Sequence, residues 1–105
     1  MPPLSPTRDV DALTDQLCEA LLTPRSREDM RRLLRDLCTP SELRALAERW
    51  HVARLLDGTE LSYRGIHDGT GVSTTTIVRV GRFLRQEPHQ GYRNAIDALE
   101  NLGAG

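Results

Sequence analysis

Residues 61–84 read LSYRGIHDGTGVSTTTIVRVGRFL, which is the pattern of a short helix, a glycine turn and a second helix. Ser62 and Ser73 stand where the two helices would begin, and their side-chain oxygens can accept hydrogen bonds from amides that lack a partner inside the helix. Gly71 can take the positive φ that a tight turn between helices often requires. The stretch therefore predicts a helix-turn-helix over about residues 62–86, the arrangement with which many proteins read DNA.

The second of these helices has an apolar face at i, i+3, i+4 and i+7, formed by Ile77, Val80, Gly81 and Leu84. Its first turn holds Thr74, Thr75 and Thr76. A recognition helix presents this turn to the base edges of the major groove, where threonine can form a hydrogen bond or pack its methyl group on thymine. We therefore expect these threonines, with Ser73 at the helix start, to contact DNA.

The same stretch is basic although the chain as a whole is not. Residues 62–86 contain four arginines and one aspartate, whereas the whole chain has a net charge of −1 and a pI near 6.3. A chain with this overall charge is a poor general binder of polyanions, so we expect a geometrically placed patch in which Arg64, His67 and Arg82 contact phosphates. The alternative is a solvated amphipathic helix that does not bind DNA.

A chain of 105 residues allows one domain, whose core buries only about 60–70% of the surface of the unfolded chain. Association with a second copy would bury more. The two cysteines, Cys18 and Cys38, lie beside leucines in helical patterns, so we expect both to be reduced and at least partly buried. We expect no metal site and no catalytic site, because His51, His67 and His89 lack cysteines or carboxylates at ligand spacing.

No apolar run approaches the roughly 20 residues that span a bilayer, and no secretory signal precedes the cysteines. We therefore expect a cytoplasmic protein without a membrane partner, which associates with the nucleoid when it binds DNA.

Four further helices are predicted from start signals and apolar stripes, which makes the expected fold all-α. The first carries Val10, Leu13, Leu17 and Leu21; the second begins at Ser26 and carries Met30, Leu33, Leu34 and Leu37. The third begins at a capping box of Thr39 and Glu42 and carries Leu43, Leu46, Ala47, Trp50 and Ala53 inward; the last carries Tyr92, Ala95, Ile96 and Leu99. We expect a disordered arm at residues 1–7, a single domain at 8–102 and a frayed tail at 103–105.

A set of residues at fixed spacings runs from Asp36 to Leu99. It comprises Asp36-Leu37-Cys38-Thr39 with Glu42, Arg49 with Val52-Ala53-Arg54-Leu55-Leu56, Tyr63 and Ile66, Thr70-Gly71-Val72-Ser73-Thr74-Thr75-Thr76-Ile77 with Arg79-Val80 and Arg82, and Gly91-Tyr92. In these residues the chain resembles the Trp repressor superfamily, and within it the TrpR-related YerC/YecD branch. The resemblance implies a six-helix fold in an intertwined homodimer. It also implies a transcriptional regulator, a repressor, that binds a palindromic operator in double-stranded DNA.

The resemblance also bears on an effector site. The Trp repressor holds the indole of its corepressor, L-tryptophan, between two arginines, whose positions here are Arg49 and Arg79. Thr39 matches the threonine whose carbonyl helps to receive the ligand ammonium group. Two positions depart from the repressor, since Val80 replaces a glycine and Phe83 replaces a serine. The two arginines could instead cap helices or form ion pairs.

The resemblance thus implies L-tryptophan or another small aromatic as effector, and the two departures lead us to expect that free L-tryptophan binds weakly or not at all. One alternative is a tryptophan-dependent repressor of the Trp operon. A second is a helical dimerisation or protein-interaction module that does not bind DNA.

Overall fold

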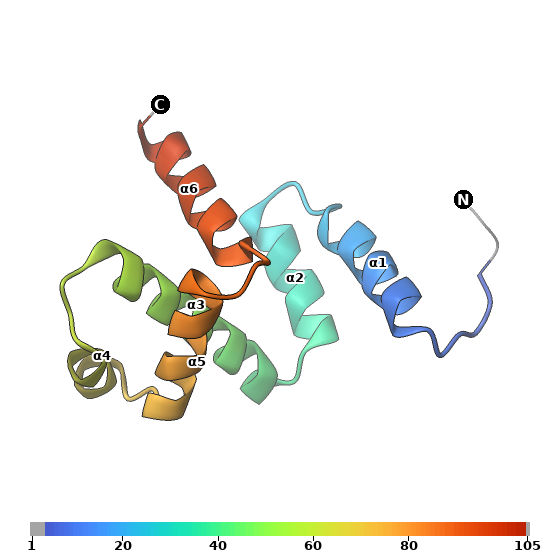
Figure 1. Ribbon diagram of the computed structural model, residues 1–105. Helices are drawn as coiled ribbons and strands as arrows, with labels where there is room; N and C mark the ends of the chain where they lie inside the picture. Colours follow the sequence, from blue (N-terminus) through green and yellow to red (C-terminus); the bar gives the residue numbers. More distant parts are fainter. Residues whose placement is uncertain (1–3, 105) are drawn as a thin grey trace. The chain divides into compact units, whose positions relative to one another are not determined.

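A computed structural model describes residues 4–104, and in this range it contains six helices and no strand (Figure 1). The helices are α1 (Val10–Leu21), α2 (Arg27–Leu37), α3 (Pro40–Gly58), α4 (Tyr63–Thr70), α5 (Thr74–Arg85) and α6 (Gly91–Ala104). The predicted all-α fold is confirmed.

The ends of the chain were expected to form an arm and a tail. Residues 4–9 have no regular secondary structure, and the first three residues of the expected arm lie outside the described range. At the other end, α6 extends to Ala104 and so includes the first two residues of the expected tail at 103–105. Gly105 lies outside the described residues.

The helix starts follow the side chains that the sequence places there. Ser26 caps α2 by accepting a hydrogen bond from the backbone N–H of Asp29. The capping box of α3 is complete: the Thr39 amide donates to the Glu42 carboxylate at 2.9 Å, and the Glu42 amide donates to the Thr39 hydroxyl at 3.2 Å. The hydrogen bonds from Thr39 lower the pKa of Glu42, because they stabilise its charged form.

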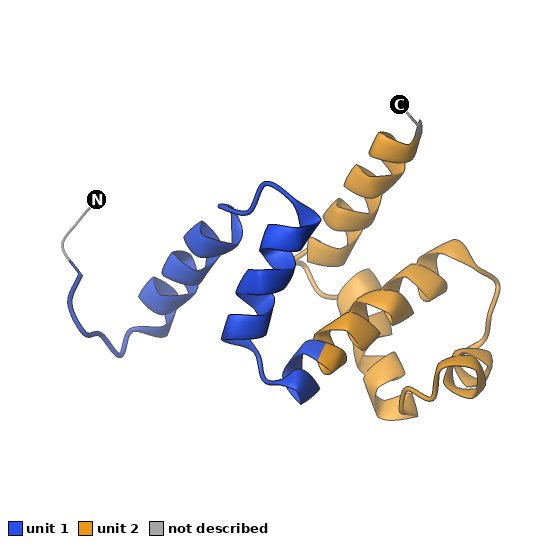
Figure 2. Cartoon of the chain, turned by 180° about the vertical axis from the view of Figure 1, so that it is seen from behind, with its two compact units in different colours: residues 1–43 blue, residues 44–105 orange. Residues whose placement is uncertain are grey.

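The chain divides into two compact units, residues 1–43 and 44–105 (Figure 2), where the sequence led us to expect a single domain. In the first unit, none of the residues of α1 or α2 is buried. Cys18 is exposed and Cys38 half-buried, so the expectation of a partly buried Cys18 is wrong for the single chain. The physical reason is that two short helices enclose no interior of their own.

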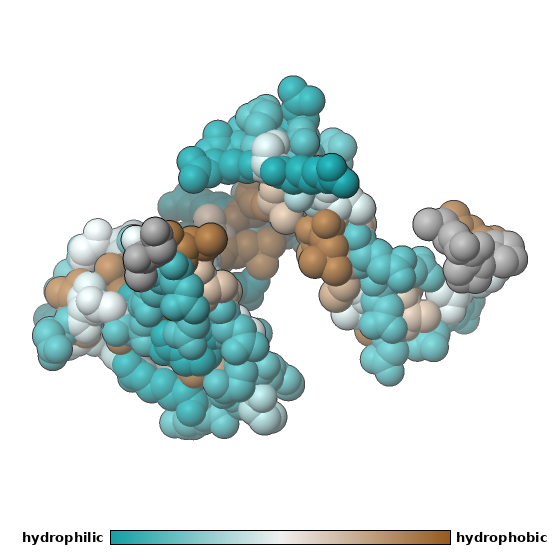
Figure 3. Space-filling view, turned by 90° about the horizontal axis from the view of Figure 1, so that it is seen from above, coloured by the Kyte–Doolittle hydropathy of each residue, from teal (hydrophilic) through white to brown (hydrophobic). Residues whose placement is uncertain are grey.

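Apolar side chains are consequently left at the surface, where Figure 3 shows them in brown among hydrophilic teal residues. Those of α1 and α2 are Val10, Leu13, Leu17 and Leu37. They belong to the two stripes that the sequence predicted. The other four residues of these stripes are half-buried: Leu21, Met30, Leu33 and Leu34. None of the eight is fully buried within this chain.

The second unit contains the core. Its buried side chains come from α3, α4, the turn after α4, α5 and α6: Val52, Ala53, Leu56, Ile66, Val72, Ile77, Val80, Leu84 and Ile96. The predicted inner face of α5 is confirmed, since Ile77, Val80, Gly81 and Leu84 are all buried. Trp50, Leu55 and Tyr92 pack against this core from its edge.

The predicted inner face of α3 is wrong in most of its members. Leu46 and Ala47 are exposed, and Leu43 and Trp50 are only half-buried. The buried residues of α3 are Val52, Ala53 and Leu56, of which only Ala53 was predicted. The core residues of α4, α5 and α6 gather against this later part of the helix, so position along α3 decides burial as much as helical phase does.

Polar contacts join α3 to α5 and α6. Arg93 of α6 forms two hydrogen bonds with the Asp57 carboxylate and also pairs with Asp97 one turn later. The hydrogen bonds from Arg93 hold the pKa of Asp57 below its ordinary value and raise that of Arg93. Arg85 of α5 donates to the backbone carbonyl of Leu56 at 3.1 Å. It thereby satisfies a carbonyl in the last turn of α3.

The last predicted helix is present as α6, and one residue of its apolar stripe is buried. Ile96 is buried and Tyr92 half-buried, whereas Leu99 is 45% exposed and Ala95 is exposed. Beyond Ile96, the second unit offers α6 no further core to pack against.

Candidate nucleic-acid interface

The turn between α4 and α5 is held by short-range hydrogen bonds. Gly71 has φ 76°, the left-handed conformation that glycine adopts without a steric cost, and its amide donates to the His67 carbonyl at 2.9 Å. The Thr70 hydroxyl donates to the Ile66 carbonyl at 2.6 Å and accepts from the Val72 amide at 3.1 Å. Gly71 therefore plays the part that the sequence predicted, and Thr70 adds a bond that it did not reveal.

His67 takes part in the same turn. Its Nδ1 lies 2.8 Å from the backbone carbonyl oxygen of Val72. Since a carbonyl oxygen only accepts, Nδ1 must carry the proton, and Nε2 is the nitrogen that remains for other contacts. We expected His67 to contact a phosphate. In the structure its side chain also binds the carbonyl group of Val72, the residue before the Ser73 cap. No pattern in the sequence signalled this contact, because it depends on the path of the turn.

The two helices of the motif approach closely at Gly81. A Cβ atom added to Gly81 would collide with the hydroxyl group at the end of the Tyr63 side chain, so that ring would have to shift for any larger residue. Ser62 caps α4 by accepting from the Gly65 amide at 3.0 Å. Both serines act as the predicted caps, and the small Gly81 lies where α5 approaches the Tyr63 ring of α4.

The hydroxyl residues at the start of α5 divide into two groups. Ser73 accepts from the Thr76 amide at 3.2 Å and donates to the Thr76 hydroxyl at 3.0 Å, and Thr76 is half-buried. Thr74 and Thr75 are exposed. Of the four hydroxyl residues expected at DNA, Ser73 and Thr76 therefore bond each other in the cap, whereas Thr74 and Thr75 are exposed to solvent.

The arginines of the motif also differ in their surroundings. Arg64 is exposed on α4. Arg82 pairs with Glu87 at 3.4 Å, and its guanidinium carbon lies 5.1 Å from the centre of the Phe83 ring. Arg79 lies over the same ring at 4.4 Å. Two of the three arginines of α5, Arg79 and Arg82, thus lie against Phe83, whereas Arg64 is exposed on α4.

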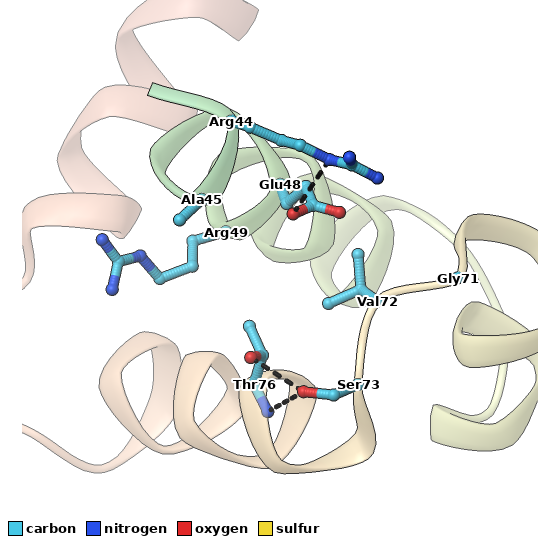
Figure 4. Close-up of a pocket in the computed structure, with 8 residues that line it drawn as sticks. All are labelled: Arg44, Ala45, Glu48, Arg49, Gly71, Val72, Ser73 and Thr76. Atoms are coloured by element: carbon cyan, nitrogen blue, oxygen red, sulfur yellow. Dashed lines mark hydrogen bonds and ion pairs between the residues drawn. The ribbon is translucent and has the colours of Figure 1, made fainter. Parts of the chain in front are cut away.

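A cavity of about 350 Å³ opens between α3 and the start of α5 (Figure 4). Its lining residues are Arg44, Ala45, Glu48, Arg49, Gly71, Val72, Ser73 and Thr76. Arg44 and Glu48 form an ion pair at 3.8 Å, and Figure 4 shows Arg44 and Arg49 pointing in opposite directions from α3. The cavity therefore combines arginine side chains with the amino-terminal end of α5, where a partial positive charge accumulates.

The five residues expected at an effector do not gather in this cavity. Arg49 lines it, but Arg79 packs on Phe83, and Phe83 stacks on His89 with the ring centres 6.0 Å apart. Val80 is fully buried in the core and does not line the cavity. Thr39 belongs to the first unit, where it caps α3. The sequence analysis did not predict that Arg44 and Glu48 line a site. Their spacing in the sequence indicates only an ion pair between residues four apart on a helix.

Within residues 4–104 no group of three or more histidine, cysteine or acidic side chains is placed to hold a metal ion. In the same range no helix is both long enough and apolar enough to cross a membrane.

Comparison with known proteins points in one direction. A family model described as Trp repressor protein matches residues 12–100. The uncharacterized protein YerC of Bacillus subtilis (strain 168) is 39% identical over 87 residues, which cover 82% of this chain and 81% of that protein.

Two solved structures are also similar. A TrpR-like protein from Eubacterium eligens ATCC 27750 is 31% identical, with a TM-score of 0.77 over 85% of this chain and 90% of the other. A Staphylococcus aureus protein described as a candidate Trp repressor is 31% identical, with a TM-score of 0.78 over 90% of this chain and 96% of the other. The similarity extends from sequence to fold across most of the chain.

Proposed function

Because the chain belongs to the Trp repressor family, we propose that it is a transcriptional regulator, a repressor, whose α4–turn–α5 motif reads a DNA operator. The observation that carries the proposal is the motif itself: a glycine turn, a capped α5 and exposed Thr74 and Thr75 at its start. The local excess of arginine supports it, since phosphate contacts supply much of the affinity for DNA. Thr74 and Thr75 then contact bases, and Arg64 contacts phosphate.

Substitutions in the motif test this proposal. Arg64→Ala should weaken binding to all duplexes alike and lower the slope of log affinity against log salt by about one phosphate contact. Thr75→Ala should instead change the preference at one base position, by about 1–3 kcal/mol. Both are measured by titrating selected and random duplexes at several salt concentrations.

Arg54→Ala is the matched control, because Arg54 is an exposed arginine of the same unit outside the motif. It should leave the salt slope unchanged. If Thr75→Ala lowered the affinity for selected and for random DNA equally, the proposed contact between Thr75 and a base would be contradicted. A wild-type protein with no salt-dependent retention on DNA would favour the alternative, a dimerisation module.

We propose in addition that the chain acts as a homodimer on a pseudo-palindromic operator. The open apolar faces of α1 and α2 support this, because a second copy with the same faces would cover them. Two recognition helices related by a two-fold axis then meet half-sites about 34 Å apart, one turn of DNA.

The cavity beside α5 supports a second proposal, that a small anionic ligand adjusts the motif. A ligand held there would contact α3 and the start of α5 together, and so would affect the position of the recognition helix. We expect L-tryptophan to be a poor ligand, because Arg79 packs on Phe83 and does not line the cavity. Another small aromatic anion fits the arginines better than an apolar molecule does.

Calorimetric titration with L-tryptophan tests this expectation. Little or no heat should appear below millimolar ligand, and Arg49→Ala should change nothing for this amino acid. A dissociation constant in the tens of micromolar or below, abolished by Arg79→Ala, would contradict it and would favour a tryptophan-dependent repressor.

A further inference from the structure

The exposed face of α5 contains an apolar side chain that the core does not require. Val78 is 56% exposed, although it directly follows the fully buried Ile77. By helical spacing Val78 lies one turn after Thr74 and Thr75, on the flank of α5 that borders its buried face. The three side chains therefore share one surface.

Val78 is also unfavourable for the helix itself. Residues 74–78 are five consecutive β-branched residues, which have lower helix propensity than alanine. For Ile77 the core compensates this cost, but an exposed valine gains no such burial in the free chain. A residue that departs from local preference without a structural gain is typical of a functional surface.

The neighbouring long side chains leave this surface uncovered. Arg82, one turn after Val78, could have laid its aliphatic part over this side chain, but its guanidinium group lies against Phe83. The side chains of Thr74, Thr75 and Val78 are short and stiff, and each carries at least one methyl group. Since β-branched side chains have few rotamers in a helix, such a surface loses little entropy on binding.

On the basis of the proposed DNA-binding function, we infer that Val78 is a specificity-determining residue that packs on the C5-methyl group of a thymine in each half-site. The C5-methyl group is the one apolar feature that bases present in the major groove, and apolar side chains recognise it by contact. Thr74 and Thr75 lie beside Val78 and supply the hydrogen bonds that fix the register.

Removal of single methyl groups from both sides of the contact tests this inference. A duplex is first selected from a random pool by the full-length chain, and each thymine is then replaced by deoxyuridine, which lacks only the methyl group. At one thymine per half-site, the wild-type protein should lose about three- to fivefold in affinity, as expected for one methyl group withdrawn from an apolar contact.

Val78→Ala removes the methyl groups on the protein side of the contact. This variant should bind the selected duplex more weakly, and the same thymine-to-deoxyuridine change should then have no further effect. Val78→Thr retains one methyl group and should retain part of the dependence. Arg54→Ala, which replaces an exposed arginine of the same unit outside the motif, is the control, and it should leave the effect of that methyl group unchanged.

The outcomes separate the two proposals. A selected duplex whose affinity depends on no thymine methyl group, or on one equally in wild type and Val78→Ala, overturns the role of Val78 and leaves DNA reading intact. Failure to enrich any duplex overturns both. Thermal unfolding of Val78→Ala serves as the check on folding, and a midpoint equal to or above that of the wild type is expected because alanine favours the helix.

Discussion

Leu37→Asp in α2 should leave most of the chain unfolded at micromolar concentration, while the wild type remains a folded dimer. Leu37 is 49% exposed in the single chain, so a charge there costs little if the protein functions as a monomer. In the proposed homodimer the same side chain lies in an apolar interface. An unpaired charge buried there costs about 3–5 kcal/mol, a large part of the stability of a small domain.

Light scattering and thermal unfolding at several protein concentrations measure this effect. The wild-type midpoint should rise with concentration, because dissociation and unfolding are linked. Leu61→Asp is the matched control: Leu61 is 48% exposed but lies between α3 and α4, outside the proposed interface. Equal stability of the two variants, or a wild type that is a folded monomer, would contradict the dimer.

Ile77→Ala should lower the stability by about 2–5 kcal/mol, the usual cost of truncating a large core side chain. Ile77 is fully buried among residues of α3, α4 and α6, and it begins the inner face of α5. For a chain of about 100 residues this loss corresponds to a fall in Tm of at least about 10 °C. The affinity for DNA should also fall, because α5 loses packing contacts with the core.

The neighbouring position supplies the control. Val78→Ala removes a comparable side chain from the exposed face and should change the stability by no more than about 0.5 kcal/mol. Thermal unfolding of both variants, with DNA titrations below the lower Tm, separates the two roles. A small loss of stability in Ile77→Ala together with a large loss in Val78→Ala would contradict the burial of Ile77 and the exposure of Val78.

Local chemistry explains why the helix-turn-helix could be predicted. The caps at Ser62, Ser73 and Thr39 involve residues three positions apart, and the turn requires one residue with positive φ. Such contacts are encoded within a few residues of each other. The spacing of Ile77, Val80, Gly81 and Leu84 likewise defines a face before anything packs against it.

Burial along α3 depended on more distant parts of the chain. Its sequence is apolar at several phases, and the predicted set began too early in the helix. The later helices supply Ile66, Ile77 and Ile96, and only their positions make Val52 and Leu56 the buried residues. Periodicity describes one helix alone, whereas burial requires a partner.

In the candidate site, too, some features could be predicted from the sequence and others depend on the tertiary structure. Sequence alone identified the motif, its hydroxyl-rich first turn and its local positive charge. Only the tertiary structure decided that Ser73 and Thr76 bond each other while Thr74 and Thr75 stay exposed, that His67 holds the Val72 carbonyl, and that Arg79 and Arg82 lie against Phe83. Local hydrogen bonds and helical phase are properties of neighbouring residues, but the direction of a long side chain depends on what the rest of the fold places within its reach.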